Sequence, residues 1–229
     1  MSSPDGFVRA LARAKTLVAE AQFAREDGDY EVAVDSLQEA VDGLDQTGWL
    51  TDVQNGQPLT ELHKEIARAL ANCLGMIGGN YRRLNRLDDA VRFFEQGRKY
   101  EEDEQFGVNS SYSLINAITL PIEMGRKSAI DQADLLRNAV RALIHQTGGE
   151  RRLDRWAWAD LGECYLLLRD LPHAQEAYES FRKHGTGDSL DSVLPVLIRI
   201  RDALNAKDPD TALVIANGID SLQRAFERD

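Results

Sequence analysis

The stretch WADLGECYLLLRDLPHAQEAYESF, residues 158–181, decides the fold of this chain. Two segments of helical character flank a short polar break at 169–172, and each carries one small residue among bulky ones. Gly162 and Ala174 leave room for two helices to cross at close range. The bulky residues that fill the space around this crossing are Trp158, Tyr165 and Tyr178. The pattern predicts two antiparallel helices joined by a tight turn.

This arrangement of residues resembles the tetratricopeptide repeat, whose period is about 34 residues. The same pattern returns at Gly78, Ala90 and Phe94, and more weakly near the N-terminus, where Glu20 and Ala21 replace the Leu-Gly pair. One such helix pair cannot bury its apolar face alone, so neighbouring pairs have to stack on it. The resemblance implies an all-α solenoid that winds as a right-handed superhelix.

The helical periodicity extends over the whole chain, which we expect to form a single domain, 1–229. Apolar residues recur at spacings of three and four, and no stretch alternates well enough to predict a strand. About five antiparallel helix pairs follow from this reading, with irregular spacing and insertions in the turns. The expected repeats are 6–46, 59–100, 109–146 and 154–183, followed by a capping helix pair at 190–228.

Several helix starts and breaks are visible in the sequence. Asp29, Thr60 and Asp208 are expected N-caps, and Ser128 with Asp131 is typical of a capping box. Pro121 should kink or shorten the helix that contains it. The segment 184–188 is expected to be a linker, and Pro195 fits only the first turns of the helix predicted at 191–205.

Two polar segments interrupt the repeats. Residues 46–58 contain several turn formers and are expected to form a loop, with Trp49 tucked against a helix end. The acidic run 101–104 is expected to be a solvated turn. Gly75, Gly78 and Gly79 are interpreted as close helix contacts, because no strand precedes them and no Gly-Lys-Ser/Thr follows, as a phosphate loop would require.

The composition limits the kinds of partner. The net charge is −11 and the pI is near 4.9, which argues against nucleic acid or an anionic membrane as the main partner. No signal peptide and no membrane span are expected, so a cytoplasmic location is the default expectation. The excess of Arg over Lys favours a bacterial source. Cys73 and Cys164 lie on apolar helix faces and are expected to be buried thiols in a reducing compartment.

No catalytic constellation can be assembled from the sequence. The four histidines, His63, His145, His173 and His184, have no partner at the spacing that metal binding requires. His63 lies beside Glu61 and Glu65, and we expect it to be exposed to solvent. The chain is therefore predicted not to be an enzyme and to hold neither a metal nor a cofactor.

A narrower resemblance concerns residues 106–120. The sequence FGVNSSYSLINAITL, together with the repeat at Trp158, is similar to the helical repeat region called the TRAFs-binding domain. That region occurs in stress-activated kinases and in bacterial signalling or defence proteins. The similarity implies a protein-binding regulatory module of bacterial signalling or defence.

Tetratricopeptide arrays present an inner concave surface built from the first helix of each pair. Carried over to this chain, the resemblance implies partner-binding residues at Asn72, Arg82, Ser113, Asn116, Trp156 and Glu163. Two interpretations of Asn116 stay open, namely a contact for a partner or an amide that satisfies a backbone group between helices. The arginines at 82–86 and 151–155 could grip an acidic peptide or a phosphate, or pair with neighbouring carboxylates.

The leading hypothesis is a non-catalytic scaffold or adaptor that binds a protein or peptide partner in its concave groove. The alternative is a regulator that senses a ligand or peptide and changes the superhelix in response. The sequence fixes neither the identity of the partner nor the oligomeric state.

Overall fold

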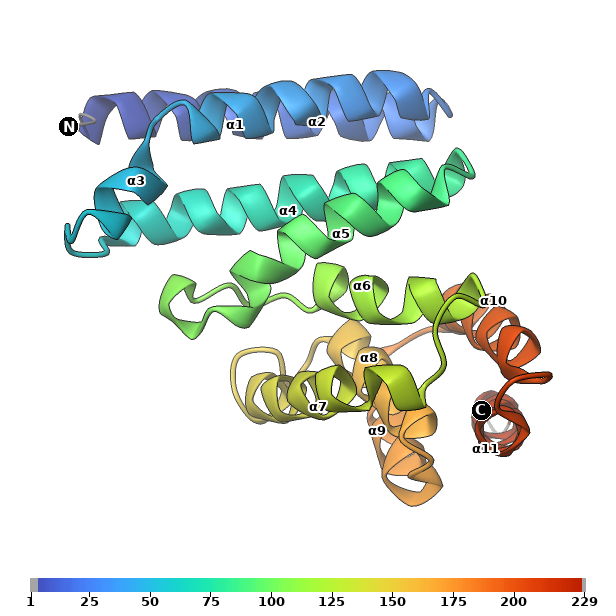
Figure 1. Ribbon diagram of the computed structural model, residues 1–229. Helices are drawn as coiled ribbons and strands as arrows, with labels where there is room; N and C mark the ends of the chain where they lie inside the picture. The colour runs from blue at the N-terminus through green and yellow to red at the C-terminus, as the bar shows by residue number, and fades with distance from the viewer. Residues whose placement is uncertain (1–3, 228–229) are drawn as a thin grey trace. The chain divides into compact units, whose positions relative to one another are not determined.

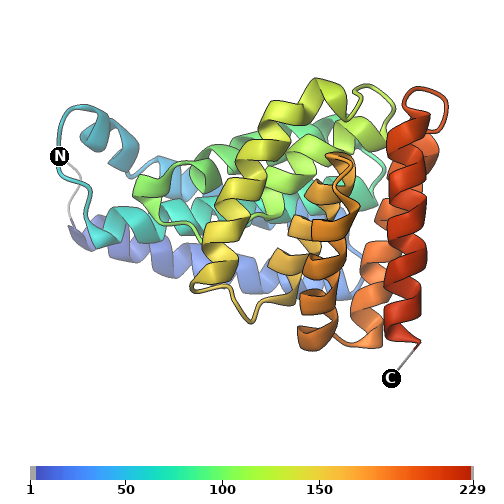
Figure 2. The same cartoon turned by 90° about the horizontal axis from the view of Figure 1, so that it is seen from below.

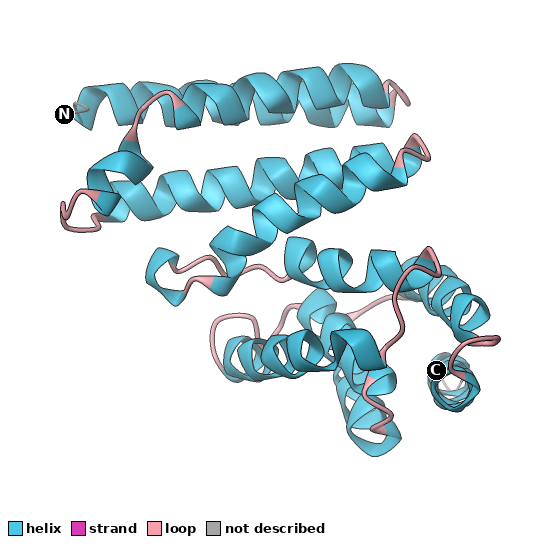
Figure 3. Cartoon of the chain, in the orientation of Figure 1, coloured by secondary structure: helices cyan, strands magenta, loops and turns pink. Residues whose placement is uncertain are grey.

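The structure, a computed structural model, describes residues 4–227 except for the side chains of residues 187 and 188. Residues 1–3, at the start of the expected domain, lie outside the described residues. So do residues 228–229, which include the end of the expected capping helix pair. Every regular element within 4–227 is a helix, which confirms the predicted all-α class (Figure 3). The α-helices are α1 Pro4–Glu26, α2 Tyr30–Asp45, α3 Trp49–Gln54, α4 Glu61–Arg83, α5 Leu87–Glu102, α6 Tyr112–Glu123, α7 Ala133–Gly148, α8 Arg155–Leu167, α9 Leu171–His184, α10 Gly187–Leu204 and α11 Pro209–Phe226 (Figure 1). Two short 3-10 helices, η1 and η2, cover Glu104–Phe106 and Ile130–Gln132.

The chain divides into two compact units at a point within α6. Unit 1 ends at Ala117 and unit 2 begins at Ile118. The expected single domain therefore stays a prediction, and each unit is described by itself.

Unit 1 contains two stacked helix pairs. α1 packs against α2, α4 packs against α5, and α4 also contacts both helices of the first pair (Figure 1). The apolar faces that the sequence predicts meet in one core cluster that runs from Phe7 to Val108. Its fully buried members include Leu17, Leu37 and Ile66.

The close helix crossing predicted at Gly162 is present and is repeated in unit 1. A Cβ atom added at Gly162 would lie 2.6 Å from the Tyr178 ring, and one added at Gly78 would lie 2.7 Å from the Phe94 ring. Both rings come from the following helix, sixteen residues on, and both are buried. The helix pairs themselves thus have the packing of the tetratricopeptide repeat.

The turns of these pairs also share one conformation. Gly28, Asn85 and Arg169 each follow the first helix of a pair, and each has a positive φ, at 84°, 56° and 62°. A left-handed residue at this position ends a helix by satisfying its last carbonyl groups. The backbone N–H of the residue that follows each left-handed residue accordingly bonds back into the helix, as from Arg86 to the Tyr81 carbonyl oxygen at 2.8 Å.

The segment 46–58 is not simply a loop, because it contains the six-residue helix α3. Trp49 opens this helix and is only 1% exposed, which confirms that it tucks inward. Its ring meets that of Phe106 edge to face, at 5.5 Å between centroids. A Gly at position 48 with φ 70° starts the helix, and such a short element has too little periodicity to be seen in the sequence.

The expectation that His63 is exposed was wrong. His63 is 4% exposed and packs edge-on against Phe7 at 5.3 Å between ring centroids. Its Nδ1 accepts a hydrogen bond from the Thr60 backbone N–H at 3.2 Å, while Thr60 Oγ1 accepts one from the His63 N–H. Thr60 is therefore the N-cap that the sequence predicts, and a histidine takes the place of the usual Glu or Gln in the capping box.

The acidic run 101–104 is only partly the solvated turn that was expected. Helix α5 continues to Glu102, and Glu101 is 7% exposed. Its carboxylate accepts the backbone N–H groups of Ser113 and Leu114, at 3.2 and 2.7 Å. These are the unsatisfied donors at the start of α6, so Glu101 serves as a cap supplied by the preceding helix.

In unit 2, α7 packs against α8, α8 against α9, and α10 against α11, while α11 also lies along α9 (Figure 2). A Cβ atom at Gly218 of α11 would lie 2.6 Å from the Leu166 side chain of α8, so this glycine allows close approach. α10 begins at Gly187, which shortens the predicted linker and leaves Pro195 inside the helix. Ser128 and Asp131 exchange both predicted capping bonds, but the element they open is η2.

An ion pair joins the turn after α8 to the start of α11. The Arg169 guanidinium donates to Asp208 Oδ1 at 2.5 Å and to Thr211 Oγ1 at 2.8 Å. Asp208 is also the N-cap predicted from the sequence, because its Oδ1 accepts the Thr211 backbone N–H at 3.3 Å. Burial disfavours the Asp208 carboxylate, but the bonds from Thr211 and Arg169 outweigh it and lower the pKa of Asp208.

Candidate functional site

Two of the predicted binding residues meet between α4 and α6 in unit 1. Arg82 Nη1 donates to Asn116 Oδ1 at 2.9 Å, and Asn116 Nδ2 donates to the Tyr112 carbonyl oxygen at 2.8 Å. Both ends of the Asn116 amide are thus engaged within the protein. Asn116 is half-buried, and the backbone group that it satisfies belongs to its own helix α6, not to a neighbouring helix as the second interpretation had it. A contact of Asn116 with a partner stays a prediction.

Glycines on α4 bring Tyr112 onto this region. A Cβ atom at Gly79 would lie 2.8 Å from the Tyr112 hydroxyl oxygen, and one at Gly75 would lie 3.1 Å from its ring. The predicted role of these glycines as close helix contacts is confirmed. Tyr112 stays 47% exposed while its ring meets Phe94 edge to face at 5.6 Å.

Asn72 lies elsewhere, in a cleft between α1 and α4. The cleft has a volume of about 400 Å³. Its residues are Leu11, Ala14, Lys15 and Val18 of α1 with Glu65, Arg68, Ala69, Asn72 and Cys73 of α4. Apolar side chains form the floor, and polar or charged ones form the rim. The side chains of Lys15 and Asn72 make no hydrogen bond or ion pair with another described residue, so both can contact a ligand.

Ser113 and Glu163 are buried. A Cβ atom at Gly97 would lie 2.4 Å from Ser113 Oγ, so Ser113 occupies the space that this glycine leaves open. Glu163 is in the core of unit 2, where its charge adds to burial in raising the pKa of Tyr178 and of Cys164. Both side chains lie beneath the surface, so neither is accessible to a partner in this conformation. Their contact with a partner remains a prediction.

Trp156 is the exposed candidate of unit 2. Its side chain is 39% exposed, the Arg155 guanidinium lies over its ring at 5.0 Å from the centroid, and Phe181 lies 6.3 Å away. A cation above an indole is favourable in water by about 0.5–1 kcal/mol. The ring is therefore held in place but keeps an accessible face.

The arginine clusters largely contact their own neighbours. Arg86 pairs with Asp89 at 2.7 Å, and Arg151 pairs with Asp154 at 2.8 Å. Arg83 lies over the Tyr30 ring and donates to the Gly79 carbonyl oxygen. The pairing that the sequence offered as one interpretation is thus present, and no cluster of free arginines marks a phosphate site among these residues.

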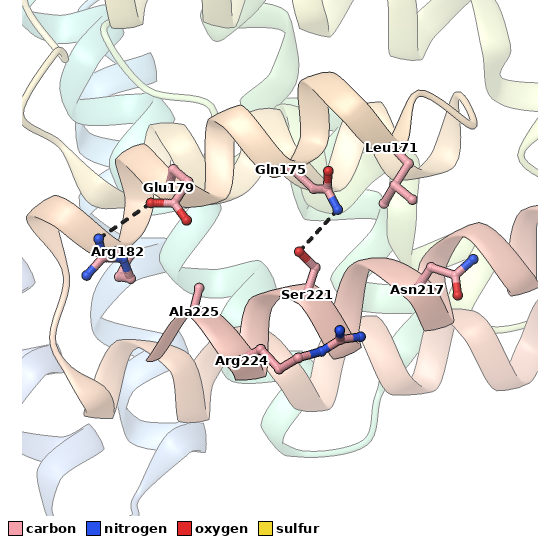
Figure 4. A pocket seen from close by; sticks show the side chains of 8 residues that line it. All are labelled: Leu171, Gln175, Glu179, Arg182, Asn217, Ser221, Arg224 and Ala225. Carbon is pink, nitrogen blue, oxygen red and sulfur yellow. Dashed lines mark hydrogen bonds and ion pairs between the residues drawn. The ribbon is translucent and has the colours of Figure 1, made fainter. Parts of the chain in front are cut away.

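A second hollow, which sequence reasoning missed, lies between α9 and α11 in unit 2 (Figure 4). It has a volume of about 610 Å³ and is lined mainly by polar and charged side chains. Gln175 Nε2 donates to Ser221 Oγ across it at 3.2 Å. The signal in the sequence is a run of polar residues at helical spacing on two helices, which does not differ from an ordinary solvated face.

The described residues show little reactive chemistry. Residues 4–227 contain no group of three or more His, Cys, Asp or Glu side chains placed to hold a metal ion. Burial raises the pKa of Cys73 to about 12 and raises that of Cys164 well above its ordinary value, so both thiols are protonated near neutral pH. Within the same residues, no helix combines the length and apolar character needed to cross a bilayer.

No model of a protein family and no curated protein matches the chain. Among solved structures, it is similar to the TPR-like repeats of a kinesin light chain from Podosopora anserina, at 14% identity. That match covers 96% of this chain and 99% of the other, with a TM-score of 0.44. BtubC from P. vanneervenii is 17% identical over 97% of this chain and 89% of its own, with a TM-score of 0.38. Neither likeness bears on what this chain binds.

Proposed function

We propose that this chain is a non-catalytic scaffold that binds a partner protein through the cleft between α1 and α4. The observation that carries the proposal is the lining of that cleft, where an apolar floor is surrounded by polar side chains. Of these, Arg68 donates to the Gly107 carbonyl oxygen, whereas the side chains of Lys15 and Asn72 contact no other described residue through a hydrogen bond or an ion pair. Its volume of about 400 Å³ falls in the range usual for ligand sites.

The chemistry of the cleft favours an amphipathic helix as its ligand. Leu11, Val18 and Ala69 offer apolar contact area and no peptide-like groups. A helix satisfies its own backbone groups and presents apolar side chains at i, i+3 and i+4, which such a floor can accept. Lys15 on the rim makes no ion pair with any residue that the structure describes and would attract a carboxylate on the polar edge of that helix.

Selection from a displayed random peptide library tests the proposal. Peptides enriched on the intact chain should carry apolar residues at helical spacing and an acidic residue. A synthetic peptide from this set, followed by fluorescence anisotropy, should bind Lys15→Glu about tenfold more weakly. Lys99→Glu makes the same charge change on an exposed part of α5 and should bind as the intact chain does.

A variant that fills the cleft gives an independent measurement. Ala69→Trp places an indole on the floor and should weaken peptide binding by more than tenfold, whereas Ala12→Trp on the exposed face of α1 should not. Urea unfolding checks that both variants are folded. Equal affinity of the two Trp variants, or enriched peptides without helical apolar spacing, would contradict the proposed use of the cleft.

We also propose that the partner belongs to bacterial signalling or defence and that binding takes place in the cytoplasm. The support is the similarity of residues 106–120 to the TRAFs-binding domain. Affinity capture from the native cell, with the intact chain compared against the cleft-filling variant Ala69→Trp, tests this. One specific protein of such a system should be lost with the variant. Recovery of only housekeeping proteins, or equal recovery with both forms, would contradict it.

A further inference from the structure

The groove between α9 and α11 differs in chemistry from the cleft in unit 1. The two helices run in the same direction, and their side chains face each other across the groove (Figure 4). Leu171 stands opposite Asn217 at one end, Gln175 bonds to Ser221 in the middle, and Arg182 lies at the other end. The walls are built from polar stripes that α9 and α11 leave facing solvent.

Groups that can both donate and accept hydrogen bonds line this groove. The carboxamides of Gln175 and Asn217 and the hydroxyl of Ser221 each offer a donor and an acceptor. The side chain of Asn217 makes no hydrogen bond with another described residue, so its carboxamide is available to a ligand. A peptide group has the same complement of one N–H and one C=O. An extended segment exposes these groups, whereas a helix has already used them.

The charges along the groove select an anionic ligand. Arg182 and Arg224 line it together with one carboxylate, Glu179, so the lining is net cationic in a chain of net charge −11. The pair of Arg182 with Glu179 is long, at 3.5 Å, and the pair of Arg224 with Asp220 is longer, at 4.0 Å, between two exposed side chains. Arg224 Nε also donates to the Asp220 carbonyl oxygen at 3.1 Å. Such pairs contribute little, so a ligand carboxylate competes with them at small cost.

We propose that the α9–α11 groove binds an extended, acidic segment of a partner protein. The backbone of the segment pairs with Gln175, Asn217 and Ser221, and its carboxylates pair with the two arginines. This site lies in unit 2 and does not depend on the cleft between α1 and α4. The protein thus has two peptide-binding surfaces, one for a helix and one for an extended chain.

The test uses a fluorescent peptide of sequence SDESPDES, whose central proline disfavours a helix. The full-length chain should bind it, and Arg182→Ala with Arg224→Ala should weaken binding about tenfold. The matched control is Arg137→Ala with Arg141→Ala, which removes the same charge from the exposed face of α7. Asn217→Ala should weaken binding about fivefold, because one hydrogen bond to the peptide backbone is lost. Gln22→Ala on α1 is its control.

Two further peptides separate the proposed mode from general attraction between charges. The same sequence with N-methylated peptide groups should bind at least fivefold more weakly, since its backbone donors are gone. Backbone amide shifts of the labelled protein should change along α9 and α11. The proposal is overturned if the peptide does not bind at millimolar concentration, if the control pair of arginines matters as much, or if N-methylation has no effect. Ala69→Trp should leave this binding unchanged.

Discussion

Gly162 and Gly43 are both helical glycines that should respond in opposite ways to an added methyl group. At Gly162 the methyl would lie 2.6 Å from the buried Tyr178 ring, whereas at Gly43 nothing lies within 4 Å. We expect Gly162→Ala to lower the free energy of unfolding by about 1–3 kcal/mol, because the core is overpacked. Gly43→Ala should raise it by about 0.5 kcal/mol through helix propensity. Urea denaturation followed by circular dichroism measures both.

The assigned cause has its own check. In Gly162→Ala with Tyr178→Leu, the smaller side chain leaves room for the methyl group, so the two costs should sum to more than the cost of the double variant. Strict additivity would mean that the ring is not what Gly162 accommodates.

Asp208 should make the stability of the protein sensitive to acid. Its folded-state pKa is lower than its ordinary value of 3.8, so its ionised form contributes stability above that value and loses it as the pH falls through the folded pKa. At pH 7 we expect Asp208→Asn to cost about 1 kcal/mol of unfolding free energy. This difference from the unmodified chain should persist at pH 5 and shrink below about pH 3.8.

Asp210→Asn is the matched control, because Asp210 is exposed and its ion pair with the same arginine is longer, at 3.4 Å. It should be neutral within about 0.5 kcal/mol at every pH. A cost of Asp208→Asn that grows on acidification would reverse the sign of the argument. Urea titrations between pH 7 and the lowest pH at which the chain stays folded provide the data.

Single residues also show what the sequence could and could not predict. The small residue at Gly162 and the ring at Tyr178 sit in one local pattern, so their contact was predictable. His63 is buried by Phe7 and by Trp49, which are far from it in the chain, and no local period shows that contact. The hydrogen bonds of Asn116 likewise come from one distant and one local group, and the sequence could only leave both interpretations open.

The helix α6 depends on a side chain outside it. Glu101 accepts two backbone N–H groups at its start, and a charged acceptor at such a position is worth about 1.5–3 kcal/mol. We expect Glu101→Ala to lower the unfolding free energy by about 2 kcal/mol. The neighbouring Glu102→Ala should change the unfolding free energy by less than about 0.5 kcal/mol, because Glu102 is exposed and its ion pair with Arg98 is long, at 3.5 Å.

Each variant removes the same charge, so comparing them separates the effect of the capping position of Glu101 from the effect of net charge. Hydrogen exchange adds a local measurement. The amides of Ser113 and Leu114 should exchange faster in Glu101→Ala and stay protected in Glu102→Ala. Equal effects of the two variants would mean that the acidic run acts only through its net charge.

At the level of elements, periodicity succeeded where helices are long. The apolar stripes of α1 and α4 span many turns, and the observed helices begin within a few residues of the predicted repeats, with α1 at Pro4 for a repeat predicted from 6 and α4 at Glu61 for one predicted from 59. Helix α3 is six residues long and shows no period, and α10 starts four residues earlier than predicted. α3 starts after a left-handed glycine, Gly48, and α10 starts where Ser189 Oγ accepts the Thr186 backbone N–H, so single turn and cap residues mark both starts and periodicity does not show them.

Among the described residues, a hollow with an apolar floor lies in unit 1 and a hollow with a polar lining lies in unit 2. Sequence reasoning reached the apolar cleft through Asn72, because the first helices of a repeat array were expected to bind. It could not reach the α9–α11 groove, since exposed polar residues are the normal lining of any helical surface. Which surface can bind a partner therefore depends on which helices lie side by side, and a single sequence does not show that.

Unit 1 should fold without the rest of the chain. Its core cluster runs from Phe7 to Val108 and is complete within it. A fragment of residues 1–123 keeps this core, the whole of α6 and the Glu101 cap. We expect cooperative urea unfolding with an m-value about half that of the full chain, because m scales with the surface exposed on unfolding. The fragment should also keep binding the helical peptide selected for the α1–α4 cleft and should not bind SDESPDES. A fragment without a cooperative transition would instead show that the chain is one cooperative domain, as the sequence alone predicts.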